Sequence, residues 1–265
     1  MTIESQAQDL LFDVSGGVAR ITINRPEARN ALTKAVVIRL ATAIEDAAKD
    51  EGARCVVLTG AGGHFSAGAD LRRTFAEDPD ALDHLDGYMD AYHSIIRAIV
   101  RCPKPTIASL DGAAVGFGAD MALACDLRVA TTAAYVQEKF VNIGLMPDGG
   151  GTFWLPRLLG TARAMQLCLL ADKLDGKKLH ELGIAVDAVP AEKLRERTME
   201  LCARVEKGPP LAYAAIKESI YSSWGDLDAA LARERTNQLR LLKTADLMEG
   251  VLAFMQKREP EFTGK

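Results

Sequence analysis

The most constraining feature of this sequence is the alternation of short apolar runs with longer amphipathic segments. Runs 55–59 and 106–110 are typical of strands covered on both faces, and segments 33–50 and 88–101 repeat apolar residues at helical spacing. Two earlier runs, 10–14 and 18–23, flank a Gly-Gly turn and predict a β-hairpin. Strands that alternate with helices predict an α/β fold with a largely parallel sheet.

The C-terminal part of the chain follows a different pattern. Strand signals stop near Lys193, and residues 226–258 are almost continuously helix-forming after a Gly-Pro-Pro break at 208–210. We therefore expect an α/β core at residues 1–200 and a helical region at residues 201–265.

Composition excludes several classes of function. The 265 residues carry 32 Lys and Arg against 36 Asp and Glu, a net charge of −4 that disfavours nucleic acid as a partner. Five widely spaced cysteines without a C-x-x-C motif fit a reducing compartment, and the four histidines show no metal-ligand spacing. No signal peptide and no apolar run of about 18 residues is visible, so we expect a cytoplasmic protein without a membrane segment or metal.

Two glycine-rich turns are the most informative local feature. Segments 59–70 and 111–120 each follow an apolar strand and lead into helix-forming sequence. Free N–H groups at such turns can stabilise an oxyanion, and two turns together can place two donors on one thioester oxygen. Ordinary structural turns are the alternative. A dinucleotide fingerprint is not complete, because Phe65 stands where the third glycine belongs, and no P-loop motif is present.

At these turns the sequence resembles the crotonase (enoyl-CoA hydratase/isomerase) superfamily. The matching segments are 24–26, 29–32, 65–71, 104–108, 112–120, 125–126, 144–147, 149–152 and 249–251, with Phe254, Lys257 and Arg258. The resemblance implies a spiral of ββα units with a helical C-terminal region that builds homotrimers, often paired into hexamers. It also implies an acyl-CoA thioester substrate, with coenzyme A as part of the substrate and no separate cofactor.

The resemblance also implies a set of site residues. The thioester oxygen is expected to accept hydrogen bonds from the N–H groups of Ala67 and Phe117. The residues expected to line the substrate path are Ala67, Gly68, Ala69, Asp70, Leu71, Gly116, Phe117 and Phe140. Phe254 and Lys257 resemble residues that reach the coenzyme A of a neighbouring subunit. In relatives, the region of Phe75, Leu82, Leu85 and Tyr88 covers the acyl pocket.

The acid/base positions decide the expected reaction. Hydratases of this family use two glutamates, and the matching positions here are Asp120 and Phe140, whose phenyl ring cannot transfer a proton. Glu138 is set aside because it would face differently on a strand. The position of Asp148 carries a second carboxylate in some relatives. They include a subgroup that resembles the ring-opening isomerase of the phenylacetate pathway. Segment 144–157 matches this subgroup better than it matches the two-glutamate hydratases.

Moving a double bond requires one base beside an oxyanion hole, whereas hydration is easier with two opposed carboxylates. We therefore expect enoyl-CoA isomerisation with Asp148 as the proton shuttle, assisted or oriented by Asp120, and with Phe117 and Phe140 as an apolar wall that raises the pKa of the base. Hydration and a non-catalytic acyl-CoA-binding subunit are the alternatives. Each residue also has a purely structural alternative: Asp120 neutralises the start of its helix, and Asp148 is an ordinary turn residue.

Overall fold

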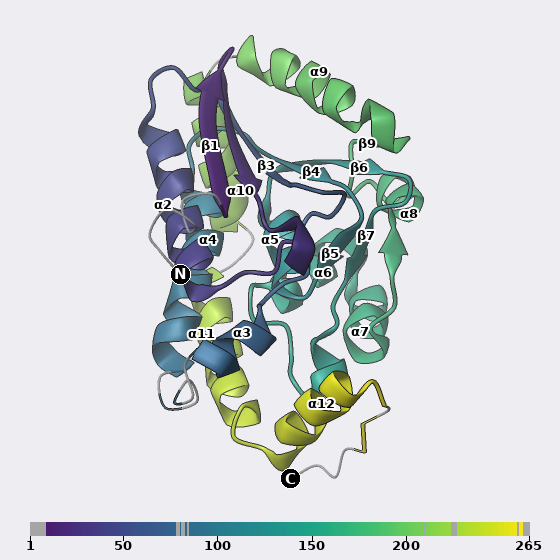
Figure 1. Cartoon of the computed structure of the whole chain (residues 1–265). Helices are drawn as coiled ribbons and strands as arrows, with labels where there is room; N and C mark the ends of the chain where they lie inside the picture. The colour runs from purple at the N-terminus through teal and green to yellow at the C-terminus, as the bar shows by residue number, and fades with distance from the viewer. Residues whose placement is uncertain are drawn as a thin grey trace.

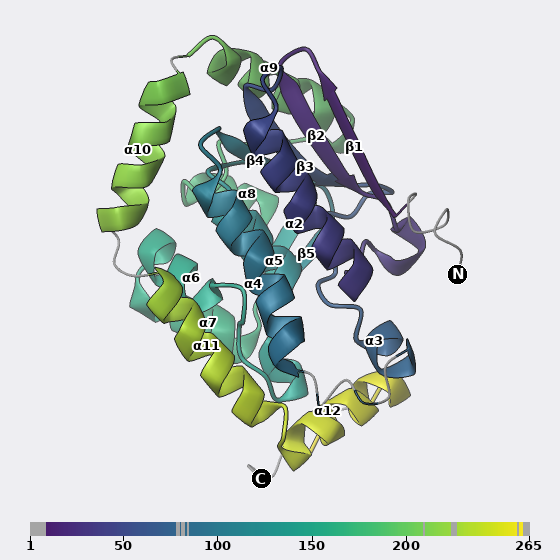
Figure 2. The ribbon, with the colours of Figure 1, turned by 90° about the vertical axis from the view of Figure 1, so that its left-hand side faces the viewer.

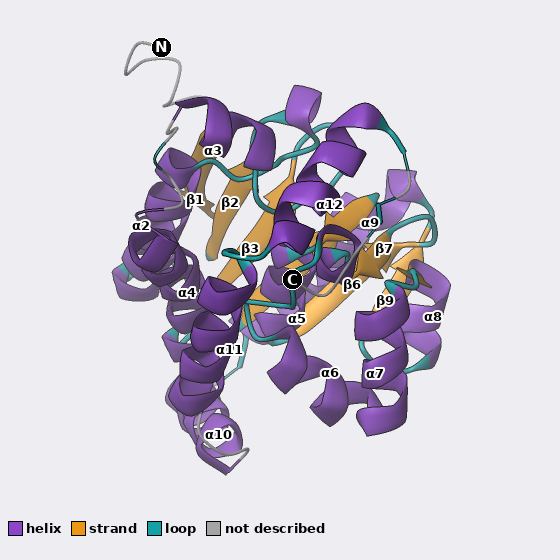
Figure 3. Cartoon of the chain, turned by 90° about the horizontal axis from the view of Figure 1, so that it is seen from below, coloured by secondary structure: helices purple, strands orange, loops and turns teal. Residues whose placement is uncertain are grey.

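The computed structural model describes residues 9–77, 80, 83, 85–208, 210–223, 227–258 and 260–261. Two β-sheets form the centre of the molecule, and helices surround them (Figure 1 and Figure 3). The larger sheet has the strand order β1 (Leu10–Ser15), β2 (Val18–Ile23), β3 (Cys55–Gly60), β4 (Thr106–Leu110), β6 (Leu127–Thr131) and β9 (Asp187–Val189). The smaller sheet has the order β5 (Ala113–Val115), β7 (Tyr135–Gln137) and β8 (Leu174–Asp175).

The chain passes repeatedly from the larger sheet to the smaller one. Strand β4 is followed by β5, and β6 is followed by β7, so each passage adds one strand to each sheet before a helix begins. The β1–β2 hairpin is antiparallel as predicted, and every other pair in the larger sheet is parallel. The predicted α/β fold with a spiral of ββα units is confirmed.

The first half contributes four α-helices. They are α2 (Lys34–Lys49), α3 (Leu71–Glu77), α4 (Leu85–Arg101) and α5 (Phe117–Ala124), with a short 3₁₀ turn η1 (Pro26–Ala28). Of these, α2 packs on strands β1, β2 and β3 of the larger sheet. Thr33 caps α2 as predicted, because its side chain accepts a hydrogen bond from Val36 N at 3.3 Å. Helices α2 and α4 run side by side (Figure 2), and every residue of α5 is buried. Helix α5 is therefore held in the core on all sides.

The second half adds helices around this core. They are η3 (Phe140–Ile143), α6 (Gly151–Leu159), α7 (Thr161–Leu170), α8 (Gly176–Glu181), η4 (Ala191–Lys193), α9 (Leu194–Glu206), α10 (Pro210–Ser223), α11 (Leu227–Leu241) and α12 (Ala245–Gln256). Helix α9 covers the opposite face of the larger sheet, where Leu201 and Cys202 pack with Val57 and Ile107. Helix α11 lies against α4 (Figure 2).

Two details differ from the sequence-based expectation. The helix-forming segment 226–258 is divided, because Thr244 caps a new helix by accepting from Leu247 N at 3.2 Å. Residue 200, the expected end of the core, falls inside α9, which packs on the sheet, so we place the start of the helical region after Glu206. The division into two regions stays a prediction. Within the ranges given above, no helix is both long and apolar enough to span a bilayer.

Candidate active site

The two glycine turns meet in space. Ser66 and Ala114 form a parallel bridge, and the N–H groups of Phe65 and Ser66 both donate to Ala113 O, at 3.0 and 2.9 Å. Gly68 adopts φ +85°, and a Cβ atom at this position would stand 2.7 Å from Val115 O. Only glycine fits this close approach. Segment 66–69 therefore lies directly against the start of α5.

The contact brings two unused backbone donors onto adjoining segments. Phe117 is the first residue of α5, and a Cβ atom on Gly68 would lie 3.2 Å from its nitrogen. Ala69 follows Gly68 in the chain. Among the residues that the structure describes, neither the Ala69 N–H nor the Phe117 N–H has an acceptor. Backbone donors without an acceptor are suited to hold a developing negative charge.

The Ala67 N–H is in a different situation. It donates to Arg29 O at 2.9 Å, so it would have to break this bond before it could donate to a substrate. The sequence-based assignment of Ala67 as an oxyanion donor is therefore corrected, and we move the candidate donor to Ala69.

Asp120 fixes the turn that precedes α6. Its side chain is buried in the first turn of α5, and Oδ2 accepts a hydrogen bond from Gly149 N at 3.0 Å. Gly149 leaves no room for a side chain, because a Cβ atom there would lie 2.7 Å from the Phe117 ring. The turn and α5 are thus in direct contact at Gly149.

Asp148 lies in this turn, between η3 and α6, and is only 8% exposed. Its Oδ2 atom accepts a hydrogen bond from Nε2 of Gln238 at 2.9 Å. Its backbone oxygen lies 2.9 Å from Nε2 of His93, and because a carbonyl can only accept, Nε2 carries the proton. Helices α11 and α4 therefore hold this one residue by its side chain and by its backbone.

Neutral groups lie near Asp148. Burial, followed by the charge of Asp148, raises the pKa of Tyr92, so the phenol stays protonated and donates to Leu32 O at 3.1 Å. Burial also lowers the pKa of His93, which favours the neutral imidazole. The Tyr92 ring packs edge-to-face on Phe117, with ring centroids 4.6 Å apart. This side of the site is therefore neutral, and these side chains place no full positive charge beside Asp148.

Phe140, which the sequence predicted as part of an apolar wall, lies beside the start of α5. The ring of Phe140 lies over Gly116, where a Cβ atom would stand 3.7 Å from Cζ of the ring. Gly116 caps α5 with φ +56°, so the phenyl ring stands beside the start of this helix. No proton-transfer group occupies the Phe140 position.

Asp120 also has a second carboxylate near it, that of Glu138. Glu138, which the sequence-based interpretation set aside, is buried. A Cβ atom on Gly151 would lie 2.6 Å from Asp120 Oδ1 and 3.0 Å from Glu138 Oε1, so the two acids flank Gly151. Glu138 is therefore close to Asp120, which its strand-like position did not indicate.

The other predicted site residues are placed differently. Asp70 forms an ion pair with Arg25 at 3.0 Å and accepts from Arg73 N at the start of α3, so its carboxylate is already engaged. Leu71 begins α3. Phe254 is 63% exposed on α12, and Lys257 ends that helix with φ 54°, away from the buried groups. Leu82 and the side chain of Phe75 lie outside the described residues, whereas Leu85 and Tyr88 are buried on α4.

Residues 13–265 match the family model described as enoyl-CoA hydratase/isomerase. Over 255 residues the chain is 40% identical to a probable enoyl-CoA hydratase of Rhodobacter capsulatus, covering 96% of this chain and 97% of that protein. It is 36% identical over 258 residues to the 1,2-epoxyphenylacetyl-CoA isomerase of Escherichia coli, covering 97% of this chain and 98% of the relative. The crystal structure of an enoyl-CoA hydratase from Mycobacterium avium subsp. paratuberculosis superposes with a TM-score of 0.87 at 36% identity, covering 96% of this chain and 98% of that one.

Proposed function

Because the chain belongs to the enoyl-CoA hydratase/isomerase family, we propose that it isomerises the double bond of an enoyl-CoA thioester. The observation that carries this proposal is the placement of Asp148. Its carboxylate is buried in a turn that contacts α5, while a phenyl ring stands at the Phe140 position. One positioned base beside an oxyanion hole is sufficient to move a double bond.

In the proposed mechanism, the N–H groups of Ala69 and Phe117 bind the thioester oxygen. The Asp148 carboxylate removes a proton from C2 of a 3-enoyl-CoA, and the electrons move to the thioester oxygen as a dienolate. Protonated Asp148 then returns the same proton to C4, which leaves a conjugated 2-enoyl-CoA and regenerates the carboxylate. The two N–H donors stabilise the negative charge where it develops.

Asp120 has a positioning role in this mechanism. Its Oδ2 atom holds the Gly149 N–H, which belongs to the peptide bond that follows Asp148. The relative named 1,2-epoxyphenylacetyl-CoA isomerase, at 36% identity, is in keeping with isomerase chemistry, and the motif of segment 144–157 resembles the same subgroup.

Hydration of a 2-enoyl-CoA is the second candidate. Asp120 and Glu138 flank Gly151, and two neighbouring carboxylates are suited to hold a water molecule and transfer its protons. The relative named probable enoyl-CoA hydratase, at 40% identity, supports this alternative.

We further propose that the chain acts as a homotrimer or as a dimer of trimers. Helices α7 and α12 carry several large apolar side chains that are more than half exposed in the single chain. They are Met165, Leu169, Leu170, Met248, Phe254 and Met255. Such clusters are commonly covered by a protein partner. The mass measured by light scattering tests this proposal, and a single chain in solution would contradict it.

The purified protein should convert a 3-enoyl-CoA to the conjugated thioester, detected by its ultraviolet absorption band. We expect Asp148→Asn to lower kcat by about 10²–10⁴-fold, the usual contribution of a general base. If the protein instead removes this band from a 2-enoyl-CoA, and Asp120→Asn or Glu138→Gln abolishes that reaction, hydration is the function. Binding of acyl-CoA without either reaction would indicate a non-catalytic subunit.

A further inference from the structure

Gln238 is a buried polar residue that the reaction described above does not use. It lies on α11, with 1% of its surface exposed, and both ends of its amide make hydrogen bonds. Oε1 accepts from Met146 N at 3.3 Å, and Nε2 donates to Asp148 Oδ2 at 2.9 Å. One side chain from α11 therefore binds the turn at two points, two residues apart.

The side chain at this position must both accept and donate, as a neutral amide does. Met146 N–H requires an acceptor, and the Asp148 carboxylate requires a donor. A lysine or arginine offers no acceptor to Met146, and an ionised glutamate offers no donor to Asp148. The orientation of the amide is fixed by the same two partners, because a rotated amide would place its oxygen against the carboxylate.

The backbone of the turn is held by other groups. His93 donates to the Asp148 carbonyl from α4, and Asp120 accepts from the Gly149 N–H from α5. These two bonds hold both sides of the peptide group that joins Asp148 to Gly149. They do not fix the rotation of the Asp148 side chain, which depends on the groups that contact its carboxylate. Gln238 is such a group.

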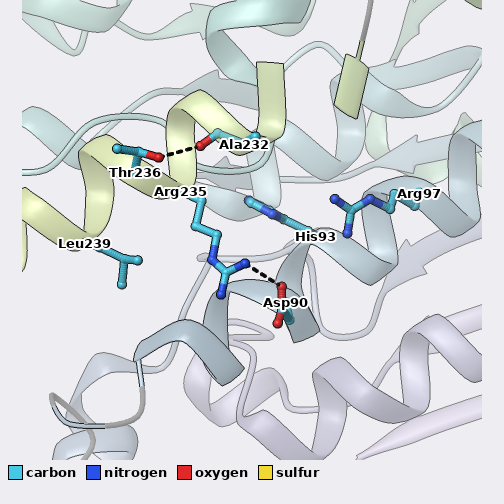
Figure 4. A pocket seen from close by; sticks show the side chains of 7 residues that line it. All are labelled: Asp90, His93, Arg97, Ala232, Arg235, Thr236 and Leu239. Carbon is cyan, nitrogen blue, oxygen red and sulfur yellow. Dashed lines mark hydrogen bonds and ion pairs between the residues drawn. The ribbon is translucent and has the colours of Figure 1, made fainter. Parts of the chain in front are cut away.

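Helix α11 is itself tied to α4 by ion pairs at the surface. Arg235, one helical turn before Gln238, pairs with Asp86 at 2.9 Å and with Asp90 at 3.4 Å. A groove of about 370 Å³ lies between the two helices, and Figure 4 shows the His93 imidazole and the Arg235 side chain at this groove. The packing of α11 on α4, to which these exposed pairs add little, places Gln238 at the turn.

Resting on the proposed function, we propose that Gln238 is a positioning residue for the catalytic base. Its Nε2–H holds Oδ2 of Asp148 and favours the ionised carboxylate, because a hydrogen bond to the charged form stabilises that form. The C-terminal helix α11 thereby sets the orientation in which Asp148 meets C2 and C4 of the substrate. Errors of about 1 Å in such a position are costly, on the order of 100-fold in rate.

The test compares Gln238→Leu and Gln238→Glu with the wild type in the 3-enoyl-CoA assay. Gln238→Leu removes both hydrogen bonds. We expect kcat to fall by about 10–100-fold with KM nearly unchanged, because the loss of a group that acts only in the transition state lowers kcat. The acid limb of its pH profile should move to higher pH. Thr236→Ala, an exposed change on the same helix, serves as the matched control and should retain wild-type kinetics.

Gln238→Glu provides a readout that a merely structural role would not give. At low pH the introduced carboxyl is protonated and can donate to Asp148, so activity should approach the wild type. As the pH rises, this group ionises beside a like charge, and activity should fall where the wild type keeps it. This variant also keeps the test decisive if Gln238→Leu does not fold.

The outcomes separate the two proposals. Isomerisation by the wild type together with wild-type kcat and pH profile in both variants overturns the role of Gln238 and leaves the proposed function standing. A wild type that does not isomerise overturns the proposed function, and with it the role of Gln238. Loss of kcat in Gln238→Leu with a falling basic limb in Gln238→Glu supports both.

Discussion

Asp120 and Asp148 lie on adjoining segments, yet they are held in very different ways. Asp120 is part of α5, whose residues are all buried, and its position follows from the packing of the core. Asp148 lies in a turn, and its bonds to His93 and Gln238 come from two helices that belong to distant parts of the chain. Under the proposed function, the acid placed by the core has a structural role, and the acid held by α4 and α11 is the one that takes part in the reaction.

The contrast predicts a difference in stability between variants at the two positions. Asp120→Ala removes the acceptor of a buried N–H, and we expect the free energy of unfolding to fall by about 1–3 kcal/mol. Asp148→Asn keeps an oxygen that can accept from Gln238. We therefore expect its free energy of unfolding to change by less than about 1 kcal/mol, although activity is lost. Urea denaturation measures both values. Asp120→Asn, which retains an acceptor for Gly149 N, is the control, and equal losses at the two positions would remove the distinction.

The bond between His93 and the Asp148 carbonyl predicts a pH dependence. Burial lowers the pKa of His93, so the unfolded chain binds its proton at a higher pH than the folded chain does. Stability contributed by the neutral imidazole is therefore present above the ordinary histidine pKa of about 6.5 and falls as the pH drops below it, by at most about 1.4 kcal/mol per pH unit.

His93→Gln keeps a donor for the Asp148 carbonyl but does not titrate. The difference in unfolding free energy between the wild type and this variant should change between about pH 7.5 and 5.5, because the histidine is the group that takes up a proton in that window. A constant difference across that range would show that His93 does not titrate on unfolding.

The ion pairs of Arg235 should have the smallest effect. The carboxylates of Asp86 and Asp90 are 67% and 61% exposed, and exposed pairs typically contribute about 0–1 kcal/mol. We expect Arg235→Gln to lower stability within this range, with a smaller effect at high salt. A drop in kcat comparable to that of Gln238→Leu would instead show that these pairs set the position of α11.

The sequence predicted features whose cause is local. The strands at 55–59 and 106–110, the Thr33 cap and the hairpin depend on patterns of neighbouring residues, and the structure confirms them. The contact between the two glycine turns was also predictable, because both follow strands of one parallel sheet. These features required no knowledge of distant side chains.

The partners of Asp148 could not be predicted in this way. Gln238 and His93 are 90 and 55 residues away from it in the chain, and a single Gln or His on a helix gives no sign of its target. The change of donor from Ala67 to Ala69 has a related cause. The directions of successive N–H groups depend on the backbone angles of Gly68, and a motif does not specify these angles.

The close packing of η3 on α12 has a consequence for the order in which the protein is completed. A Cβ atom on Gly250 would lie 2.6 Å from Ile143 Cα, so the segment leading to Asp148 lies against α12. A ribosome releases the sheets and both open N–H groups before it releases α11 and α12. A nascent chain can therefore hold its candidate oxyanion donors before its proposed base is in place, and the proposed activity begins only after α11 and α12 have been synthesised.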